Sequence, residues 1–165
     1  MSPPALKFIR PMSSSEYESW VPASIAGYAA EKVRAGNWPA DGALERSRKE
    51  HEELLPSGLN SPDNVFFSII NFEERAVGVL WIKVRPAQAP KTPDDRDVYI
   101  YNIEVNSDSQ GKGLGSGAMR DLETYCLSQG IRSIRLHVFG HNETAQRLYR
   151  HLGYETTNIN MLKTL

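Results

Sequence analysis

The sequence predicts an α+β fold built around one mixed β-sheet. Three observations carry this prediction: two helix-like segments come first, β-rich apolar segments separated by turns follow, and the second half reads strand, helix, strand, helix, strand. A helix that joins two neighbouring strands makes them parallel, whereas a short hairpin turn makes them antiparallel. The expected order is β-α-α-β-β-β-α-β-α-β, in a single domain spanning residues 1–165.

The first half is expected to hold a short strand, two helices and a hairpin. Ser13 with Glu16 forms a capping box at the start of the first helix, in which Pro22 is expected to introduce a kink or a break. Asp41 is the expected cap of the second helix. These elements are predicted at residues 6–10 (strand), 13–34 and 41–55 (helices), and 65–70 and 76–84 (strands).

The second half is expected to continue the sheet on both sides of a glycine-rich turn. Gly130 and Gly153 each follow a helix-like run and are typical helix stops, while Asn142 is the expected cap of the last helix. Alternating apolar and polar residues after Tyr154 predict a final strand. These elements are predicted at residues 98–105, 132–138 and 154–163 (strands) and 119–129 and 142–152 (helices).

The composition predicts one cytoplasmic globular domain. The chain has 165 residues, 40% of them apolar, and 19 Lys plus Arg against 20 Asp plus Glu give a net charge of −1. This balance gives no reason to expect nucleic acid or an anionic membrane as a partner. No apolar run approaches the ~20 residues needed to span a bilayer, and the N-terminus lacks a secretory signal. A single cysteine, Cys126, excludes an internal disulfide and a thiolate zinc cluster, so no metal is expected.

The stretch from Gln110 to Ala118 is the most informative about function. It is rich in glycine and lies between a strand and a helix, where free backbone N–H groups and the helix dipole attract a phosphate. The spacing Gly113-x-Gly115-x-x-Ala118 also fits the dinucleotide fingerprint of a Rossmann oxidoreductase. The acidic residue that such a protein needs about 20 positions later is missing. No P-loop pattern occurs either, so another phosphorylated ligand is favoured.

Two stretches together resemble the GCN5-related N-acetyltransferase (GNAT) family, and most closely its bacterial stand-alone members. Gln110-Gly-Lys-Gly-Leu-Gly115 matches the family's coenzyme A loop, Gln/Arg-x-x-Gly-x-Gly/Ala. The run from Asn142 to Tyr154 matches its second motif, Asn-x-x-Ala-x-x-Leu-Tyr-x-x-x-Gly-Phe, with Tyr154 in place of Phe. The two motifs stand in the family's order and separation. The resemblance implies a GNAT-like mixed central sheet flanked by helices.

The resemblance further implies that acetyl-CoA is the co-substrate. In such a fold the parallel strands, here 98–105 and 132–138, splay apart, and the pantetheine arm enters the gap as a short extra strand. A backbone N–H near Val105 polarises the thioester carbonyl, and the pyrophosphate lies on the glycine loop. The residues implied in coenzyme binding are Ile103, Val105, Gln110, Gly111, Lys112, Gly113, Leu114, Gly115, Ser116, Asn142, Ala145 and Tyr149.

Acetyl transfer to an amine needs a proton acceptor for the amine and benefits from a proton donor at the departing sulfur. Tyr149, in the family's tyrosine position, is the implied donor. Tyr99 stands where several relatives carry a glutamate base, so that base does not transfer. Glu104, a charge in an apolar strand, and His137 are the two candidate bases. A structural ion pair and a core histidine are their respective alternatives.

The expected activity is N-acetylation of a primary amine on a small molecule, protein or peptide. A non-catalytic coenzyme A-binding module of the same fold is the alternative. The N-terminal helices, the 85–96 loop and the last strand are expected to bind the acceptor, but no motif there identifies it. Tyr28, Trp38 and Trp81 either line that pocket or fill the core. A homodimer through the final strand or the helices is the default expectation for such folds.

Overall fold

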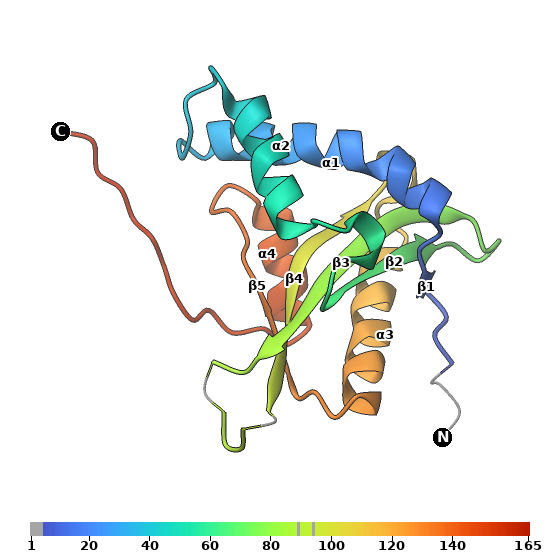
Figure 1. Ribbon diagram of the computed structural model, residues 1–165. Helices are drawn as coiled ribbons and strands as arrows, with labels where there is room; N and C mark the ends of the chain where they lie inside the picture. Colours follow the sequence, from blue (N-terminus) through green and yellow to red (C-terminus); the bar gives the residue numbers. More distant parts are fainter. Residues whose placement is uncertain (1–4, 89, 94) are drawn as a thin grey trace.

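A computed structural model describes residues 5–88, 90–93 and 95–165 (Figure 1). Its five strands form one sheet in the order β1-β2-β3-β4-β5, in which β4 and β5 are parallel and the other neighbours antiparallel. The α+β prediction is confirmed. The strands are β1 (Ile9–Pro11), β2 (Asn64–Ile70), β3 (Ala76–Pro86), β4 (Arg96–Val105) and β5 (Ser133–Leu136), and the helices are α1 (Ser14–Arg34), α2 (Ala43–Leu54), α3 (Leu114–Ser128) and α4 (Glu143–His151).

The helices cover both faces of the sheet. Figure 1 shows α1 and α2 over one face and α3 with α4 against the other. The α3 face holds the larger core, where Leu80, Ile82 and Val98 pack with Met119 and Leu122 of α3. A second, aromatic core joins α1 and α2 to the opposite face and contains Met12, Trp20, Leu55, Phe66 and Trp81. Each face therefore carries its own core, with side chains alternating between the two along every strand.

The start of α1 follows the predicted capping box. The Ser13 hydroxyl accepts a hydrogen bond from the Glu16 backbone N–H, and the Glu16 carboxylate accepts one from the Ser13 N–H at 2.9 Å. Pro22 removes one helix hydrogen bond but does not end the helix, so a break at this residue was wrong. The buried residues Trp20 and Ile25 lie on either side of Pro22, so both halves of α1 pack against the rest of the protein.

Other boundaries differ from the sequence predictions for identifiable reasons. The first strand begins at Ile9 instead of Leu6, because the Asp121 carboxylate takes the backbone N–H groups of Lys7, Phe8 and Ile9 at 2.7, 2.6 and 3.3 Å. Helix α2 begins after Gly42, at a φ of 74°, and no side chain caps it, so Asp41 is not its cap. Helix α3 begins at Leu114, five residues earlier than expected, and includes the later glycines of the loop.

The largest error concerns the chain after α4. Residues 154–163 were predicted to form a final strand, but no element is assigned there, and every residue from Glu155 to Leu165 is exposed. A strand requires a hydrogen-bonding neighbour. None is recorded for this segment within the part of the chain that the structure describes. The alternating pattern is present, but no neighbouring strand pairs with this segment among the described residues.

Candidate active site

The parallel strands β4 and β5 separate halfway along β4. Ile100 lies opposite Ile82 and Asn102 lies opposite Trp81, so Tyr101 is an extra residue that makes a bulge in β4. Beside β5, only Asp97 to Ile100 are paired. From the bulge to Val105, the β4 backbone therefore lacks a neighbour on the β5 side, among the residues described. This is the splayed arrangement that the resemblance implies.

Cross-strand partners show which face each residue of the open end occupies, because directly opposed residues share a face. Ile103 lies opposite the fully buried Leu80 and Val105 opposite Gly78, so both turn toward α3. Glu104 lies opposite Val79, which packs in the aromatic core, and therefore points to the α1 face. Glu104 is exposed there. No ion-pair partner of its carboxylate is found among the described side chains, and the expected structural alternative gains no support.

The glycine loop presents an uncapped helix start beside the open end of β4. Gly111 and Gly113 have φ values of 75° and 77°, which glycine adopts without strain, and Gly113 is the residue before α3. No side chain caps this helix, so the N–H groups of its first turn remain available to an anion. The Gln110 side-chain amide donates to the Val105 carbonyl at 2.8 Å, which ties the loop to β4. These residues fit a bound pyrophosphate.

Lys112 and Gly115 have different places in this loop. The Lys112 ammonium donates to the Asp108 carbonyl at 2.9 Å and is exposed, so it bridges the loop to the preceding turn. A Cβ on Gly115 would lie 3.8 Å from a Leu148 methyl and 4.0 Å from a Val105 methyl. Gly115 thus marks the point where α3, α4 and the end of β4 meet. Leu114 is buried there and Ser116 is half-buried.

Tyr149 lies on α4, next in the chain to Leu148. Its ring is half-buried against the α3-side core and lies 5.7 Å from the ring of Tyr154. Burial raises the pKa of Tyr149 above its ordinary value. Within the described residues no hydrogen-bond partner of its hydroxyl is found. The phenol is therefore protonated at neutral pH and has a proton to donate.

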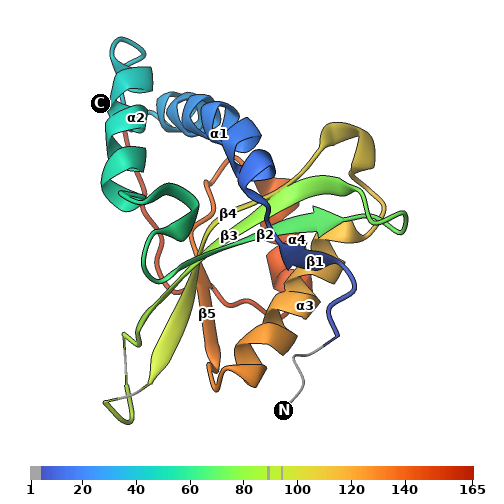
Figure 2. The ribbon, with the colours of Figure 1, turned by 45° about the vertical axis from the view of Figure 1, so that its right-hand side comes forward.

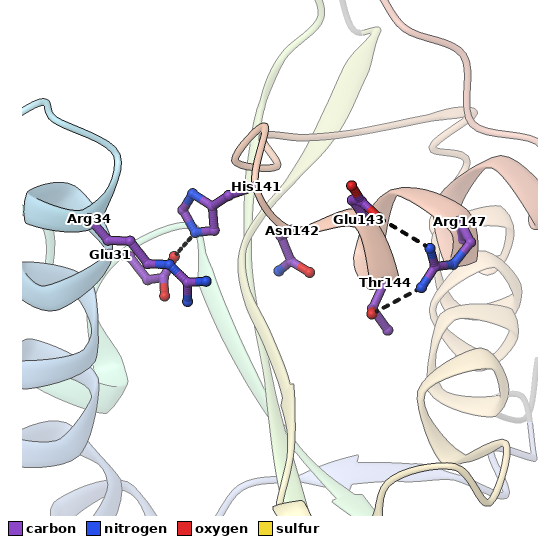
Figure 3. Close-up of a pocket in the computed structure, with 7 residues that line it drawn as sticks. All are labelled: Glu31, Arg34, His141, Asn142, Glu143, Thr144 and Arg147. Carbon is purple, nitrogen blue, oxygen red and sulfur yellow. Dashed lines mark hydrogen bonds and ion pairs between the residues drawn. The ribbon is translucent and has the colours of Figure 1, made fainter.

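The second motif begins at a cavity between α1 and α4. The Asn142 side chain accepts a hydrogen bond from the Ala145 N–H at 3.1 Å and caps α4 as predicted. The preceding residue, His141, places its Nε2 atom 2.6 Å from a Glu31 carboxylate oxygen of α1 (Figure 3). The cavity has a volume of about 380 Å³ and is lined by Glu31, Arg34, His141, Asn142, Glu143, Thr144 and Arg147.

His137 was predicted within the strand at 132–138, but β5 ends at Leu136, so His137 follows the strand, and it is exposed instead of lying in the core. By the two-residue period of the strand it shares a face with Arg135, which lies opposite Tyr99 on the α1 side. Partial burial, and then the positive charge of Lys32, lower the pKa of His137 below its ordinary value. The imidazole is therefore neutral at pH 7 and able to accept a proton.

An aromatic row on the α1 face of β4 was only partly anticipated. The Tyr101 ring stacks on Trp81 at 4.6 Å and meets Tyr99 edge-on at 5.0 Å, while the Arg85 guanidinium lies 4.4 Å from the centre of the Tyr99 ring. Trp81 and Trp38 are buried and fill the core, whereas Tyr28 is partly exposed. Sequence reasoning missed Tyr101, although the alternation of tyrosines from Val98 onward would have placed it beside Tyr99 on one face.

The closed end of the β4–β5 pair is held by a carboxylate that sequence reasoning also missed. Asp97 accepts hydrogen bonds from the Ser133 hydroxyl, from the Arg135 guanidinium at 2.8 Å and from the Gln88 N–H at 3.1 Å. Burial alone would raise the pKa of Asp97, but the hydrogen bonds from Ser133 and Arg135 outweigh it and lower this pKa. Asp97 is a charged residue at the start of an apolar strand, and this position in the sequence could have indicated a buried carboxylate with hydrogen-bond partners.

Over residues 5–88, 90–93 and 95–165, no cluster of three or more His, Cys, Asp or Glu side chains is arranged to hold a metal ion. Over the same residues, no helix combines the length and the apolar character needed to cross a membrane.

Comparison with known proteins gives matches along nearly the whole chain. Residues 30–154 match the model of the Acetyltransferase (GNAT) family. YycN of Bacillus subtilis (strain 168), named an uncharacterized N-acetyltransferase, is 34% identical over 157 residues, or 95% of this chain and 97% of YycN. YdgE of the same strain has the same description and is 32% identical over 154 residues, or 93% of this chain and 95% of YdgE.

Solved structures show the same relationship. A crystal structure of the Bacillus subtilis acetyltransferase YycN matches with a TM-score of 0.86 and 35% identity over 95% of this chain and 97% of that one. AAC(6')-Iy, solved with the bisubstrate analogue CoA-S-monomethyl-acetylneamine, shares the fold at 18% identity and a TM-score of 0.58 over 95% of this chain and 96% of that one. The family match over most of the chain and the two relatives that align along nearly all of it establish that the chain belongs to the GNAT family of acetyltransferases.

Proposed function

We propose that this protein is an N-acetyltransferase that moves an acetyl group from acetyl-CoA to a primary amine of a small molecule or peptide, with residues 1–165 acting as one catalytic domain. The observation that carries the proposal is the open end of β4. There an unpaired strand edge lies beside an uncapped helix start, which suits a pantetheine arm and a pyrophosphate. Acetyl-CoA supplies an activated thioester for this reaction.

The coenzyme side of the site would use backbone groups more than side chains. The N–H groups from Gln110 to Ser116, at the positive end of α3, are suited to hold a pyrophosphate. The unpaired backbone of Ile103 and Val105 is suited to pair with the amide groups of a pantetheine arm. Asn142 and Ala145 begin α4 beside the cavity that opens next to α1. Glycine leaves the backbone of this loop accessible, so a glycine-rich sequence is suited to binding through backbone groups.

The acceptor amine would approach from the α1 face. Glu104 and His137 both belong to this face, and Tyr99 and Tyr101 form its aromatic part. A neutral amine is needed for direct attack, so one of the two side chains must accept its proton, directly or through water. Tyr149 lies on the opposite, α3 side of the gap, where it would donate a hydrogen bond to the departing thiolate. Proton acceptor and proton donor thus approach the gap from opposite faces.

A non-catalytic coenzyme A-binding module is the second candidate. It is favoured by one observation: Tyr99 occupies the position at which several members of the family carry a glutamate base. Both candidates predict coenzyme binding, so binding alone does not separate them. Transfer of the acetyl group to an acceptor amine is what distinguishes an enzyme from a binding module.

The test uses the full chain, acetyl-CoA and a panel of amines that includes amino sugars, polyamines, lysine and short peptides. Release of free thiol, measured spectrophotometrically and corrected for hydrolysis without amine, reports turnover. Calorimetry with coenzyme A measures binding in the same preparation. Turnover with at least one amine supports the enzyme. Tight coenzyme binding without thiol release across the panel would favour the module.

A further inference from the structure

Arg85 carries a positive charge that the fold does not neutralise. It lies on β3 and is half-buried, with its guanidinium carbon 4.4 Å from the centre of the Tyr99 ring. Its Nε atom is buried, and within the described part of the chain it has no hydrogen-bond partner. The ion pairs among the same residues do not include Arg85. Buried donors normally have acceptors, so this guanidinium is suited to a partner from outside the chain.

The carboxylate nearest to Arg85 along the sheet is already occupied. Asp97 lies directly opposite Arg85 in the β3–β4 pair, on the same face of the sheet. Its two oxygens accept hydrogen bonds from the Ser133 hydroxyl, the Arg135 guanidinium and the Gln88 N–H. The arginine of β5 therefore uses this counter-ion, and the arginine of β3 does not.

Tyr99 does not replace the missing counter-ion. Burial, and to a smaller extent Tyr101, raise the pKa of Tyr99, although Arg85 acts in the opposite direction. The phenol therefore stays protonated near neutral pH and offers only its ring face to the guanidinium. Lys83 lies opposite Tyr99, on the same face as Arg85, and it too forms no ion pair among the residues described. Two uncompensated cations thus flank the Tyr99 ring.

This cationic part of β3 borders the acceptor side of the site. Tyr99 stands two residues before the bulge at Tyr101, where the gap opens, or about 7 Å along the strand. Figures 1 and 2 both show the end of β3 and the start of β4 extending past α1 and α2, which leave this part of the sheet uncovered. The glycine loop and α4 lie toward the α3 face instead. A positive charge at Arg85 is therefore placed for the acceptor, not for the coenzyme.

We propose that Arg85, with Lys83 beside it, binds an anionic group of the acceptor, so that the substrate is an amine that also carries a carboxylate or a phosphate. This inference rests on the proposed acetyltransferase function and names its substrate class. A guanidinium can donate two parallel hydrogen bonds to either anion, and at a half-buried position these bonds are less screened than at the surface. Glu104 lies toward the open end of β4, where it suits the amine end of the same molecule.

The test compares matched pairs of acceptors, with the full chain, acetyl-CoA and detection of free thiol. One pair is a short peptide as the free acid and as the C-terminal carboxamide. The other pair is an amino sugar with and without a phosphate group, so the two pairs distinguish the carboxylate from the phosphate. We expect kcat/KM to be at least about tenfold higher for the anionic member of at least one pair, the scale of a hydrogen bond to a charged group.

Variants of Arg85 assign this preference to one side chain. Arg85→Met keeps an unbranched side chain over the Tyr99 ring, and it should bring kcat/KM for the anionic member down to that of its neutral counterpart, mainly through a higher KM. Arg85→Lys keeps the charge but loses the planar fork, and it should retain part of the preference. Arg75→Met is the matched control, because Arg75 lies in the turn before β3 and pairs with Glu73. It should leave the preference unchanged.

Each other outcome overturns the inference. Equal kcat/KM for both members of each pair would exclude an anion site while leaving the proposed function in place. A preference that survives in Arg85→Met would place the anion on another residue, and an equal loss in Arg75→Met would mean that net charge alone attracts the substrate. The absence of thiol release with every acceptor would remove the proposed function and this inference with it. Circular dichroism confirms that the variants are folded, and Arg85→Lys provides the reading if Arg85→Met is not.

Discussion

The two ends of β4 differ in how they interact with the neighbouring strand β5. At the closed end, Asp97 binds Ser133 and Arg135, and the backbones of β4 and β5 are paired. At the open end, beyond the bulge at Tyr101, that pairing is absent. At the closed end the hydrogen-bonding groups have partners within the protein, and these contacts stabilise the fold. The open end leaves backbone groups unused, and this is the property that a ligand-binding strand edge requires.

The boundary between the two ends lies at one additional residue. Pairing with β5 stops at Ile100, directly before the extra residue Tyr101, so the bulge marks the point at which the gap opens. Gly78 supports the open end from the other side, because a Cβ at this position would lie 2.2 Å from the Glu104 carbonyl oxygen. The backbone of β3 therefore lies close to the backbone of Glu104 at the open end of β4, and only glycine allows this approach.

Changes at the open end should affect ligand binding most strongly at the glycine loop. We expect Gly113→Glu to abolish measurable coenzyme A binding, a loss of at least about 10³-fold, since its carboxylate would stand at the anion-binding helix start. The φ of 77° at this position adds strain to any side chain. Isothermal titration calorimetry with coenzyme A measures the effect.

Gly113→Ala is the matched control for the loop. It introduces the same backbone strain without the charge, and a Cβ there has no protein atom within 4 Å. We expect affinity to fall less than about tenfold, in line with a strain of about 1 kcal/mol. Normal affinity in Gly113→Glu would remove this loop from the coenzyme site, and equal loss in both variants would mean that strain, not charge, is responsible.

At the closed end the expected effect is on stability. We expect Asp97→Ala to lower the free energy of unfolding by about 2 to 3 kcal/mol, because it leaves Arg135 and Ser133 without their shared acceptor. Urea unfolding followed by fluorescence measures the change. Asp41→Ala removes an exposed carboxylate that caps no helix and should change stability by less than about 0.5 kcal/mol.

The wild-type protein allows a second test of the same carboxylate. The folded pKa of Asp97 is lower than that of an unfolded aspartate, so its contribution is complete above about pH 4 and disappears as pH falls toward the folded pKa. Asp97→Ala should therefore lose less stability than the wild type when the pH is lowered through this window. Parallel pH dependence in the two proteins would exclude Asp97 as a source of acid sensitivity.

Tyr149→Phe tests the open end for chemistry instead of binding. We expect a decrease in kcat of about 10²-fold, the usual scale for a positioned proton donor, with coenzyme A affinity nearly unchanged. Burial keeps the pKa of Tyr149 above its ordinary value of 10.0, so activity should not fall from ionisation of this phenol near neutral pH. Steady-state rates and calorimetry measure the two quantities, and an unaltered kcat would remove Tyr149 from the mechanism.

Sequence reasoning predicted the features that depend on neighbouring residues. The capping box at Ser13, the glycine loop before α3 and the cap at Asn142 are each encoded within a few positions and were confirmed. The order of the elements up to α4, the hairpin of β2 and β3 and the parallel pair of β4 and β5 were also predicted correctly, because hairpins and helical crossovers are encoded locally. The fold could therefore be predicted from the sequence, while the coenzyme-binding role of the glycine loop stays a prediction.

Features that depend on distant contacts were missed. Asp121 shortens β1 by binding three backbone N–H groups more than 110 residues away in the chain, and no local pattern announces this. The bulge at Tyr101 arises from the register between two strands, which alternation alone does not specify. The predicted final strand failed for the same reason, since a strand depends on a partner as much as on its own residues.

The smallest expected effect concerns the proton acceptor on the α1 face. If His137 accepts the amine proton, kcat/KM should rise with pH through a midpoint below 6.5, because partial burial and the charge of Lys32 lower its pKa from that ordinary value. His137→Gln should remove this midpoint and lower the rate at pH 7 about tenfold, less than a fully enclosed base would. Glu104→Gln, at the other exposed candidate, should leave the midpoint in place.

Lys32→Met sharpens this assignment without touching either candidate base. Removing the positive charge takes away one cause of the lowered pKa, so the midpoint should move upward toward 6.5 while the maximal rate stays within about twofold. If His137 had a merely structural role, the pH profile of kcat/KM would not follow its titration and would not respond to Lys32→Met. If Glu104→Gln abolishes the rise and Lys32→Met leaves the midpoint unmoved, the proton goes to Glu104, and the end of β4 supplies the base while the residue after β5 does not.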